Sequence, residues 1–189
     1  DIQHPALLEY LKSRKVENQT AYLKEIHYRV NDKSYFGIGF KNDSGGYEIR
    51  NKYSKICLGK KDISTIKNGE ESLRIFEGFF DFLSFKNLED NLQKKPSDYI
   101  ILNSVSMIPK IKNLIQNYQK VELYFDNDNA GNRAVEMIKN AGENIEDCRI
   151  LYKTHKDLNE FLMSWEMRKR DTGREYEDLN KINTRKIGR

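Results

Sequence analysis

The spacing of apolar residues changes along the chain and predicts a small antiparallel module followed by an alternating α/β unit. Near the start, Leu7, Leu8 and Leu11 share one helical face, which predicts a helix over residues 5–14. Residues 26–50 are rich in β-branched and aromatic side chains and are interrupted by the turn sequence NDSGG. This pattern predicts a hairpin or a small meander of strands.

From Leu73 onward, strand-like and helix-like segments alternate. The expected strands are LRIFEG at 73–78, YIILNS at 99–104, VELYF at 121–125 and CRILY at 148–152. The expected helices span residues 79–92, 108–118, 128–140 and 158–170. Because short strands joined by helix-length connections form parallel sheets with right-handed crossovers, this half of the chain predicts an α/β fold. The polar residues after Asp171 are expected to form a frayed tail.

Composition excludes several classes of protein. The 189 residues are 38% hydrophobic and include 21 Phe, Tyr and Trp side chains, which is enough apolar material for a core. No apolar run approaches the roughly 18 residues of a membrane span and no signal peptide pattern is present, so we expect a cytoplasmic protein without membrane contact. Cys57 and Cys148 lie far apart and the three histidines are isolated, which predicts neither a disulfide framework nor a zinc site. Position 1 is Asp rather than Met, which is compatible with a piece of a longer protein.

The formal net charge of +4 conceals an uneven distribution. Residues 1–69 carry a net charge of +5, residues 70–165 carry −4, and residues 166–189 carry +3. We therefore expect three parts: a helix followed by a basic antiparallel β module, an acidic α/β domain, and a polar basic C-terminal helix or tail.

Four carboxylates are expected at one edge of the predicted parallel sheet. Glu77 ends the first strand, Asp126 ends the third and Asp128 follows two residues later, while Asp81 lies one helical turn beyond Glu77. In an open α/β sheet, ligands bind outside the carboxyl ends of the strands. Carboxylates gathered there repel one another unless a cation neutralises them, and hard oxygen ligands suit Mg²⁺ or Mn²⁺. The pattern predicts a divalent-metal site.

Other interpretations of these acids fit less well. DNDNAG opens like a calcium-binding EF-hand loop, but its twelfth position is Met137 rather than Glu, and it follows a predicted strand instead of a helix. A phosphatase of the haloacid type would carry its DxD pair after the first strand rather than the third. Helix capping would account for Asp126 or Asp128, yet it leaves Glu77 and Asp81 unexplained.

EGFFD at 77–81 and FDNDNAG at 125–131 resemble the two motifs of the Toprim domain, a strand-end Glu-Gly and a strand-end DxD, in the right order and on the expected elements. This resemblance covers roughly residues 70–165 and implies a Rossmann-like parallel sheet flanked by helices. The Toprim domain occurs in bacterial primases, topoisomerases of types IA and II, OLD-family nucleases and recombination mediators.

The motifs are more similar to those of DnaG-type bacterial primases than to those of topoisomerases, because position 130 is Ala where topoisomerases place Glu. HKDLNEFL at 155–162 resembles the KDxNE/D element of primase-like Toprim proteins from plasmids and conjugative elements, especially of Bacteroides type. The resemblance implies that Asp157 adds to the metal cluster. The alternative is that Asp157 only caps the last helix.

In such primase-like proteins a basic antiparallel module precedes the Toprim fold, and residues 40–51 and 61–64 resemble it. We offer four cations of this region as contacts to nucleic acid or nucleotide phosphate: Arg50, Lys52, Lys60 and Lys61. The alternative is an ordinary solvated charged face. The position of a +5 module beside a −4 metal site favours a functional role.

The resemblance implies metal-dependent nucleotidyl transfer that makes RNA primers on single-stranded DNA from nucleoside triphosphates, in replication or mobilisation of DNA, with a helicase as a further partner. Asp126 and Asp128 would bind Mg²⁺ or Mn²⁺, Asp81 and Asp157 would complete its ligands, and Glu77 would be a ligand or a general acid or base. Two glycines are expected to be structural at the site: Gly78 and Gly131. No zinc ribbon is present in these residues, so a Toprim nuclease and a non-catalytic nucleic-acid-binding module stay open.

Overall fold

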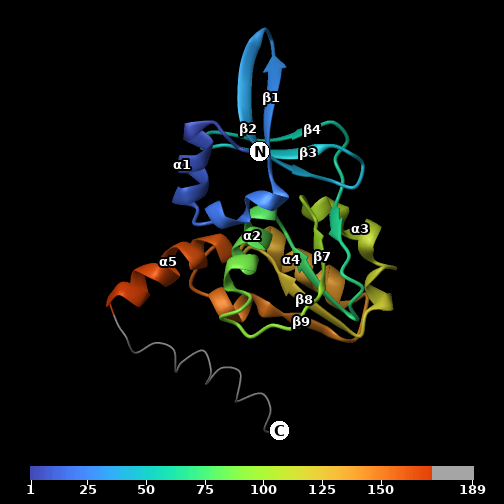
Figure 1. Ribbon diagram of the computed structural model, residues 1–189. Coiled ribbons are helices and arrows are strands. Elements are labelled where there is room, and N and C mark those ends of the chain that lie inside the picture. The colour runs from blue at the N-terminus through green and yellow to red at the C-terminus, as the bar shows by residue number, and fades with distance from the viewer. Residues whose placement is uncertain (172–189) are drawn as a thin grey trace.

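A computed structural model describes residues 1–171 of the chain, with side chains described as far as Trp165. Figure 1 shows an N-terminal antiparallel sheet lying against a second sheet that is flanked by helices. Residues 1–171 contain no helix that is long and apolar enough to span a membrane.

The N-terminal part is a helix and a four-stranded antiparallel sheet of order β1-β2-β3-β4. Its elements are α1 (Pro5–Ser13), the 3₁₀ turn η1 (Glu17–Tyr22), β1 (Lys24–Val30), β2 (Lys33–Lys41), β3 (Tyr47–Arg50) and β4 (Lys55–Leu58). Helix α1 begins where predicted, because the His4 ring caps it by accepting the Ala6 N–H at 3.2 Å. Strands β1 and β2 are joined at Asn31 and Asp32, both with positive φ, and project beyond the sheet as an arm (Figure 1).

The second sheet has the order β5-β7-β6-β8-β9 and is parallel except at β5, which pairs antiparallel with β7. Its strands are β5 (Ser64–Ile66), β6 (Ser72–Phe76), β7 (Asp98–Ile101), β8 (Lys120–Tyr124) and β9 (Ile145–Asp147). Its helices are α2 (Phe79–Leu88), α3 (Ile108–Ile111), α4 (Asn129–Lys139) and α5 (Leu158–Asp171), with 3₁₀ turns η2 (Val105–Met107), η3 (Ile115–Asn117) and η4 (Cys148–Tyr152). The predicted α/β fold with a preceding α+β module is confirmed.

The central strands β6, β7 and β8 are buried on both faces, as expected for a parallel sheet covered on both sides. Phe76 and Tyr124 face the core beneath α2 and α5, whereas Ile75 and Leu123 face the core beneath α3 and α4. The first of these cores also contains side chains of α1 and of β2. Phe40 on β2 stacks on the Phe79 ring of α2 with centroids 5.3 Å apart. The N-terminal module therefore packs on the α2 face through a continuous hydrophobic core.

Two predicted elements were wrong. Residues 148–152 form the 3₁₀ turn η4 rather than a strand, because strand β9 ends at Asp147, whose carboxylate accepts the Arg149 N–H at 3.1 Å and caps the turn. Residues 108–118 form the single turn of α3, a further turn and η3 rather than one continuous helix. In each case a local cap or turn replaces the regular element. The core beneath α3 still contains Ile108, Ile111 and Ile115, whereas Ile150 in η4 is exposed.

Candidate metal centre

Three carboxylates converge beyond the carboxyl ends of β6 and β8. One ligand oxygen from each of Asp81, Asp126 and Asp157 lies within 4.8 Å of the others. Asp81 stands in the first turn of α2, Asp126 follows β8, and Asp157 immediately precedes α5. The three residues come from separate segments, so the fold rather than local sequence assembles this triad.

The topology explains why these segments meet. From β6 the chain passes to β7 on one side and then to β8 on the other, so β6 and β8 are the parallel neighbours at which the direction of winding reverses. Loops diverge at such a switch point and leave room for a ligand. Glu77, directly after β6, accepts the Asp126 N–H through Oε2 at 3.3 Å and so links the two strand ends.

Asn127 holds the third carboxylate segment in place. Its side-chain amide donates to the carbonyl oxygens of Tyr152 at 3.0 Å and His155 at 2.8 Å, and its N–H donates to the Lys156 carbonyl at 2.6 Å. The Tyr152 hydroxyl donates in turn to the carbonyl of Phe125 at 2.9 Å. These bonds place the segment before Asp157 beside the end of β8. No sequence pattern indicates this role of Asn127, because its partners are backbone carbonyls, which any residue supplies.

Asp128 lies beside the triad but is not one of its three members. Its Oδ1 accepts the N–H groups of Ala130 at 2.8 Å and Gly131 at 2.9 Å, so it caps α4. A Cβ atom on Gly131 would lie 2.1 Å from the Asp126 carbonyl oxygen, which explains the glycine at that position. A Cβ on Gly78 would lie 3.3 Å from Oδ2 of Asp81, so this glycine leaves space around the carboxylate.

Asp157 caps α5 and also lies within the triad. Its Oδ1 accepts the Glu160 N–H at 2.7 Å in the first turn of α5, while the Glu160 carboxylate accepts the Lys156 N–H at 2.5 Å. This reciprocal arrangement resembles a capping box. Capping and membership of the triad therefore coexist in the same carboxylate.

Burial and neighbouring carboxylates raise the pKa of three acids at the site, Glu77, Asp81 and Asp126. Burial, then the charges of Glu77, Asp157 and Asp128, raises the pKa of Asp126 to about 7. Burial and the neighbouring Asp157 and Asp126 carboxylates raise the pKa of Asp81 well above its usual range, and burial raises that of Glu77. Asp81 is only 7% exposed and its Oδ1 has no hydrogen-bond partner among the described residues. A buried oxygen without a partner, within a cluster of repelling carboxylates, fits a divalent cation with oxygen ligands.

A second acidic group, Glu122 with Glu146 and Cys148, is explained by ion pairs. The buried Glu122 carboxylate lies 2.6 Å from Nε of Arg74 and 2.7 Å from Nζ of Lys94, and it also pairs with Lys120 at 2.8 Å. Because its charge is already neutralised, this group has a structural role.

The cations proposed from the sequence lie on the N-terminal sheet and its loops. Lys52, Lys60 and Lys61 are exposed, whereas the Arg50 guanidinium stacks over the Phe79 ring at 5.5 Å and has a buried Nη1 without a described partner. Burial lowers the pKa of Arg50, and the charge of Asp81 opposes this effect, so Arg50 lies on the side of the module that faces the triad.

Two cations near the carboxylates escaped sequence reasoning. The positive charge of Lys55 and that of Lys156 both lower the pKa of Glu77, and Lys156 does the same for Asp126. Partial desolvation, then the charges of Arg50 and Lys61, lowers the pKa of Lys55 itself. Lys55 belongs to the basic stretch 50–61, so the composition of that stretch could have indicated it as a candidate contact.

Two family models match the chain. The description "Toprim-like" applies to the model that matches residues 74–162, and a domain of unknown function (DUF8464) matches residues 1–59. No protein with a curated description matches the chain.

Solved structures share the fold at low sequence identity. The primase fragment of the bacteriophage T7 primase-helicase protein is 19% identical with a TM-score of 0.54, and the alignment covers 82% of this chain and 66% of that fragment, just under two thirds. The zinc-binding and RNA polymerase domains of the Aquifex aeolicus primase are 17% identical with a TM-score of 0.46, over 88% of this chain and 48% of that one. Together with the strand order and the matched family model, the first of these likenesses shows that residues 74–162 form a Toprim-like domain.

Proposed function

We propose that the chain is a primase-like nucleotidyltransferase that uses Mg²⁺ or Mn²⁺ to make RNA primers on single-stranded DNA from nucleoside triphosphates, in replication or mobilisation of DNA. The observation that carries this proposal is the triad of Asp81, Asp126 and Asp157, buried at the switch point of a Toprim-like sheet. The fold shared with the T7 primase fragment favours nucleotidyl transfer over other phosphoryl-transfer reactions.

The three triad carboxylates would hold the metal ion, with Glu77 and Asp128 beside them. When bound, such an ion neutralises charge on the reacting phosphate and lowers the pKa of a bound hydroxyl. Glu77 has a raised pKa and stands at the strand end, so it is suited to accept or return a proton at its carboxylate oxygen, or to act as a further ligand.

The basic N-terminal module would hold the phosphate backbone. Arg50 and Lys55 lie on its side towards the acidic site and would contact the phosphates nearest to it. The exposed Lys52, Lys60 and Lys61 would contact more distant phosphates, which makes affinity fall with salt. In this proposal residues 1–69 bind nucleic acid and residues 70–165 perform the chemistry. Residues 166–189 lie outside the described side chains.

A primer assay tests the proposal. The protein is incubated with single-stranded DNA, labelled ribonucleotides and Mg²⁺ or Mn²⁺, and new oligoribonucleotides are expected. Asp126→Asn should abolish them, whereas Asp90→Asn, which changes an exposed carboxylate outside the site, should leave them unchanged. Shortened DNA without new oligoribonucleotides would instead support a Toprim nuclease, and DNA binding without either product would support a non-catalytic module. The T7 relative is described as a primase-helicase, so a replicative helicase is the partner we propose to test for stimulation.

A further inference from the structure

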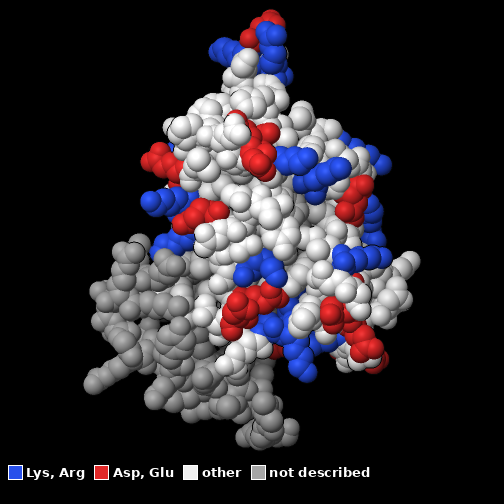
Figure 2. Space-filling view, viewed as in Figure 1, with Lys and Arg blue, Asp and Glu red and all other residues white. Residues whose placement is uncertain are grey.

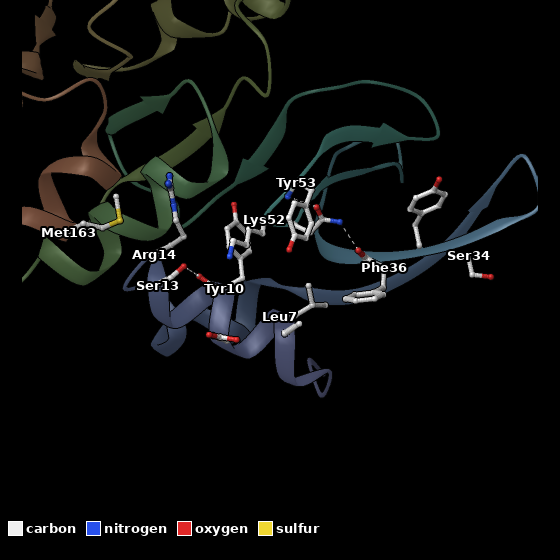
Figure 3. Close-up of a pocket in the computed structure, with 13 residues that line it drawn as sticks. Leu7, Tyr10, Ser13, Arg14, Ser34, Phe36, Lys52, Tyr53 and Met163 are labelled. Atoms are coloured by element: carbon white, nitrogen blue, oxygen red, sulfur yellow. Dashed lines mark hydrogen bonds between the residues drawn. The ribbon is translucent and has the colours of Figure 1, made fainter.

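A cavity of about 720 Å³ opens on the N-terminal module and is not part of the carboxylate site. Figure 3 shows its side chains spread along an elongated surface, from Ser34 on the arm to Met163 on α5. Helix α1, strand β2 and the turn between β3 and β4 supply the other lining residues. The volume lies in the range of ligand-binding sites.

Aromatic rings are concentrated in this cavity. Tyr10, Tyr35, Phe36 and Tyr53 line it, and Tyr53 is 88% exposed, an unusual position for a large ring. The Asn51 side chain fixes the turn that presents Tyr53, because its Oδ1 accepts the Tyr53 N–H at 2.9 Å and its amide donates to the Phe36 carbonyl at 2.9 Å. The turn therefore holds an exposed ring in a defined position.

Two of the rings already belong to stacks on the arm and beside it. Phe36 stacks against the His4 ring with centroids 3.9 Å apart, and Tyr35 stacks against Tyr28 at 5.5 Å. Because an aromatic face offers the same surface to every base, rings arranged in this way suit unpaired bases of any sequence.

The charge of the cavity complements phosphate. Arg14 and Lys52 line it, opposed by the single carboxylate of Glu9. Nε of Arg14 is buried and has no hydrogen-bond partner among the described residues. At the tip of the arm, Figure 2 shows further Lys and Arg side chains together with acidic ones. The combination of cations with exposed rings distinguishes this surface from an apolar groove for a peptide.

The inner end of the cavity packs against α2. The Tyr10 ring meets the Phe80 ring edge-on at 5.6 Å, and Arg14 lies over the same ring at 5.3 Å. Phe80 stacks on Phe79 at 4.8 Å, directly before Asp81 in α2. Because Phe79 and Phe80 are buried, these contacts belong to the hydrophobic core and join the wall of the cavity to α2, the helix that carries Asp81.

We propose that this cavity binds an unpaired segment of single-stranded nucleic acid, with a base stacked on Tyr53 and phosphates held by Arg14 and Lys52. The proposal rests on the proposed function, since it supplies the template path for that chemistry. An elongated surface with four rings suits a strand better than one free nucleotide.

The test measures binding without metal, so that it does not depend on catalysis. A fluorescein-labelled oligothymidylate is titrated in EDTA at low salt and followed by anisotropy, and stacking is followed by quenching of 2-aminopurine in a second oligonucleotide. Tyr53→Leu should weaken binding about 5- to 150-fold and reduce quenching, whereas Tyr53→Phe should stay within about twofold of wild type. Ile150→Ala, at an exposed apolar position outside the cavity, serves as the matched control.

The charge contribution is tested separately. Lys52→Ala should reduce the slope of log affinity against log salt by about 0.7, the value for one phosphate contact on a single strand, and Lys112→Ala, at an exposed position elsewhere, should not change it. Binding of the Tyr53→Leu variant within about twofold of wild type overturns the proposal. The proposal is also overturned if a ribonucleoside triphosphate displaces the oligonucleotide when both are present at the same concentration.

The two proposals fail in different assays. If Asp126→Asn abolishes primer synthesis while Tyr53→Leu binds DNA like wild type, the metal site stands and the cavity assignment is wrong. If no primers form while Tyr53→Leu loses oligonucleotide binding, the cavity assignment stands without the proposed chemistry.

Discussion

Asp126→Asn tests whether repulsion among the carboxylates of the site destabilises the metal-free folded protein. The substitution keeps the shape of the side chain and removes its charge. In the wild-type protein, burial and the neighbouring carboxylates raise the pKa of Asp126 from 3.8 to about 7. The folded protein therefore holds a proton at this site that the unfolded chain loses near pH 4. It follows that the metal-free wild type loses stability as pH rises from about 4 to about 7.

The size of this loss follows from the pKa. A rise of the pKa from 3.8 to about 7 corresponds to about 4 kcal/mol in the free energy of unfolding. Because Asp126 is only half-buried, solvent screening reduces this, and we expect about 2 kcal/mol. The variant should therefore be more stable than wild type by about 2 kcal/mol at pH 8 in EDTA, and the difference should vanish near pH 4. For a chain of this size that amounts to about 4–8 °C in melting temperature.

Thermal melts followed by circular dichroism at pH 4, 6 and 8 measure this difference. Mg²⁺ in excess should raise the melting temperature of the wild type and not that of the variant, because a ligand stabilises only the state that binds it. Asp90→Asn is the control at an exposed carboxylate and should match wild type throughout. Equal melting temperatures of Asp126→Asn and wild type at pH 8 in EDTA would refute the electrostatic reasoning.

Three further predictions concern the support of the site. Gly131→Ala places a Cβ 2.1 Å from the Asp126 carbonyl oxygen and should lower the free energy of unfolding, measured in urea, by about 1–3 kcal/mol. The control Gly142→Ala meets only the end of the Ile145 side chain and should lower it less. Asn127→Ala removes two hydrogen bonds and should cost about 2 kcal/mol; it should also weaken Mn²⁺ affinity measured by calorimetry, and unchanged affinity would show that Asn127 does not position Asp157. Arg74→Met removes the closest partner of the buried Glu122, which keeps Lys94 and Lys120, and should lower the free energy of unfolding by about 1.5–3 kcal/mol. Arg74→Met with Glu122→Leu should restore most of this loss.

The sequence predicted the elements whose signals are local. Helix α4 begins at Asn129, one residue after the predicted start, because an N-cap carboxylate at Asp128 and a glycine that permits close approach both act within a few residues. The alternation of strands and helices likewise sufficed for the α/β fold. Residues 148–152 were misassigned because a mainly apolar run fits a strand and a 3₁₀ turn equally well, and only the cap at Asp147 decides between them.

The sequence indicated the candidate acids of the site but not which of them lie together in the fold. The expected strand ends and the turn after Glu77 indicated four acids, and the family resemblance added Asp157. The structure brings ligand atoms of Asp81, Asp126 and Asp157 within 4.8 Å of one another and uses Asp128 as a cap. Asp157 reaches this position through bonds from Asn127 to backbone carbonyls, which depend on the folded path of residues 152–156. The cavity beside α1 had no sequence signal, since its rings come from segments that are far apart along the chain.

The most direct test of the central claim is a crystal of the protein soaked in Mn²⁺ and measured at a wavelength where manganese scatters anomalously. The account predicts an anomalous peak in contact with carboxylate oxygens of Asp81, Asp126 and Asp157, and its loss in Asp126→Asn. Absence of a peak there in the wild type, or a peak only beside Glu122 and Glu146, would contradict it.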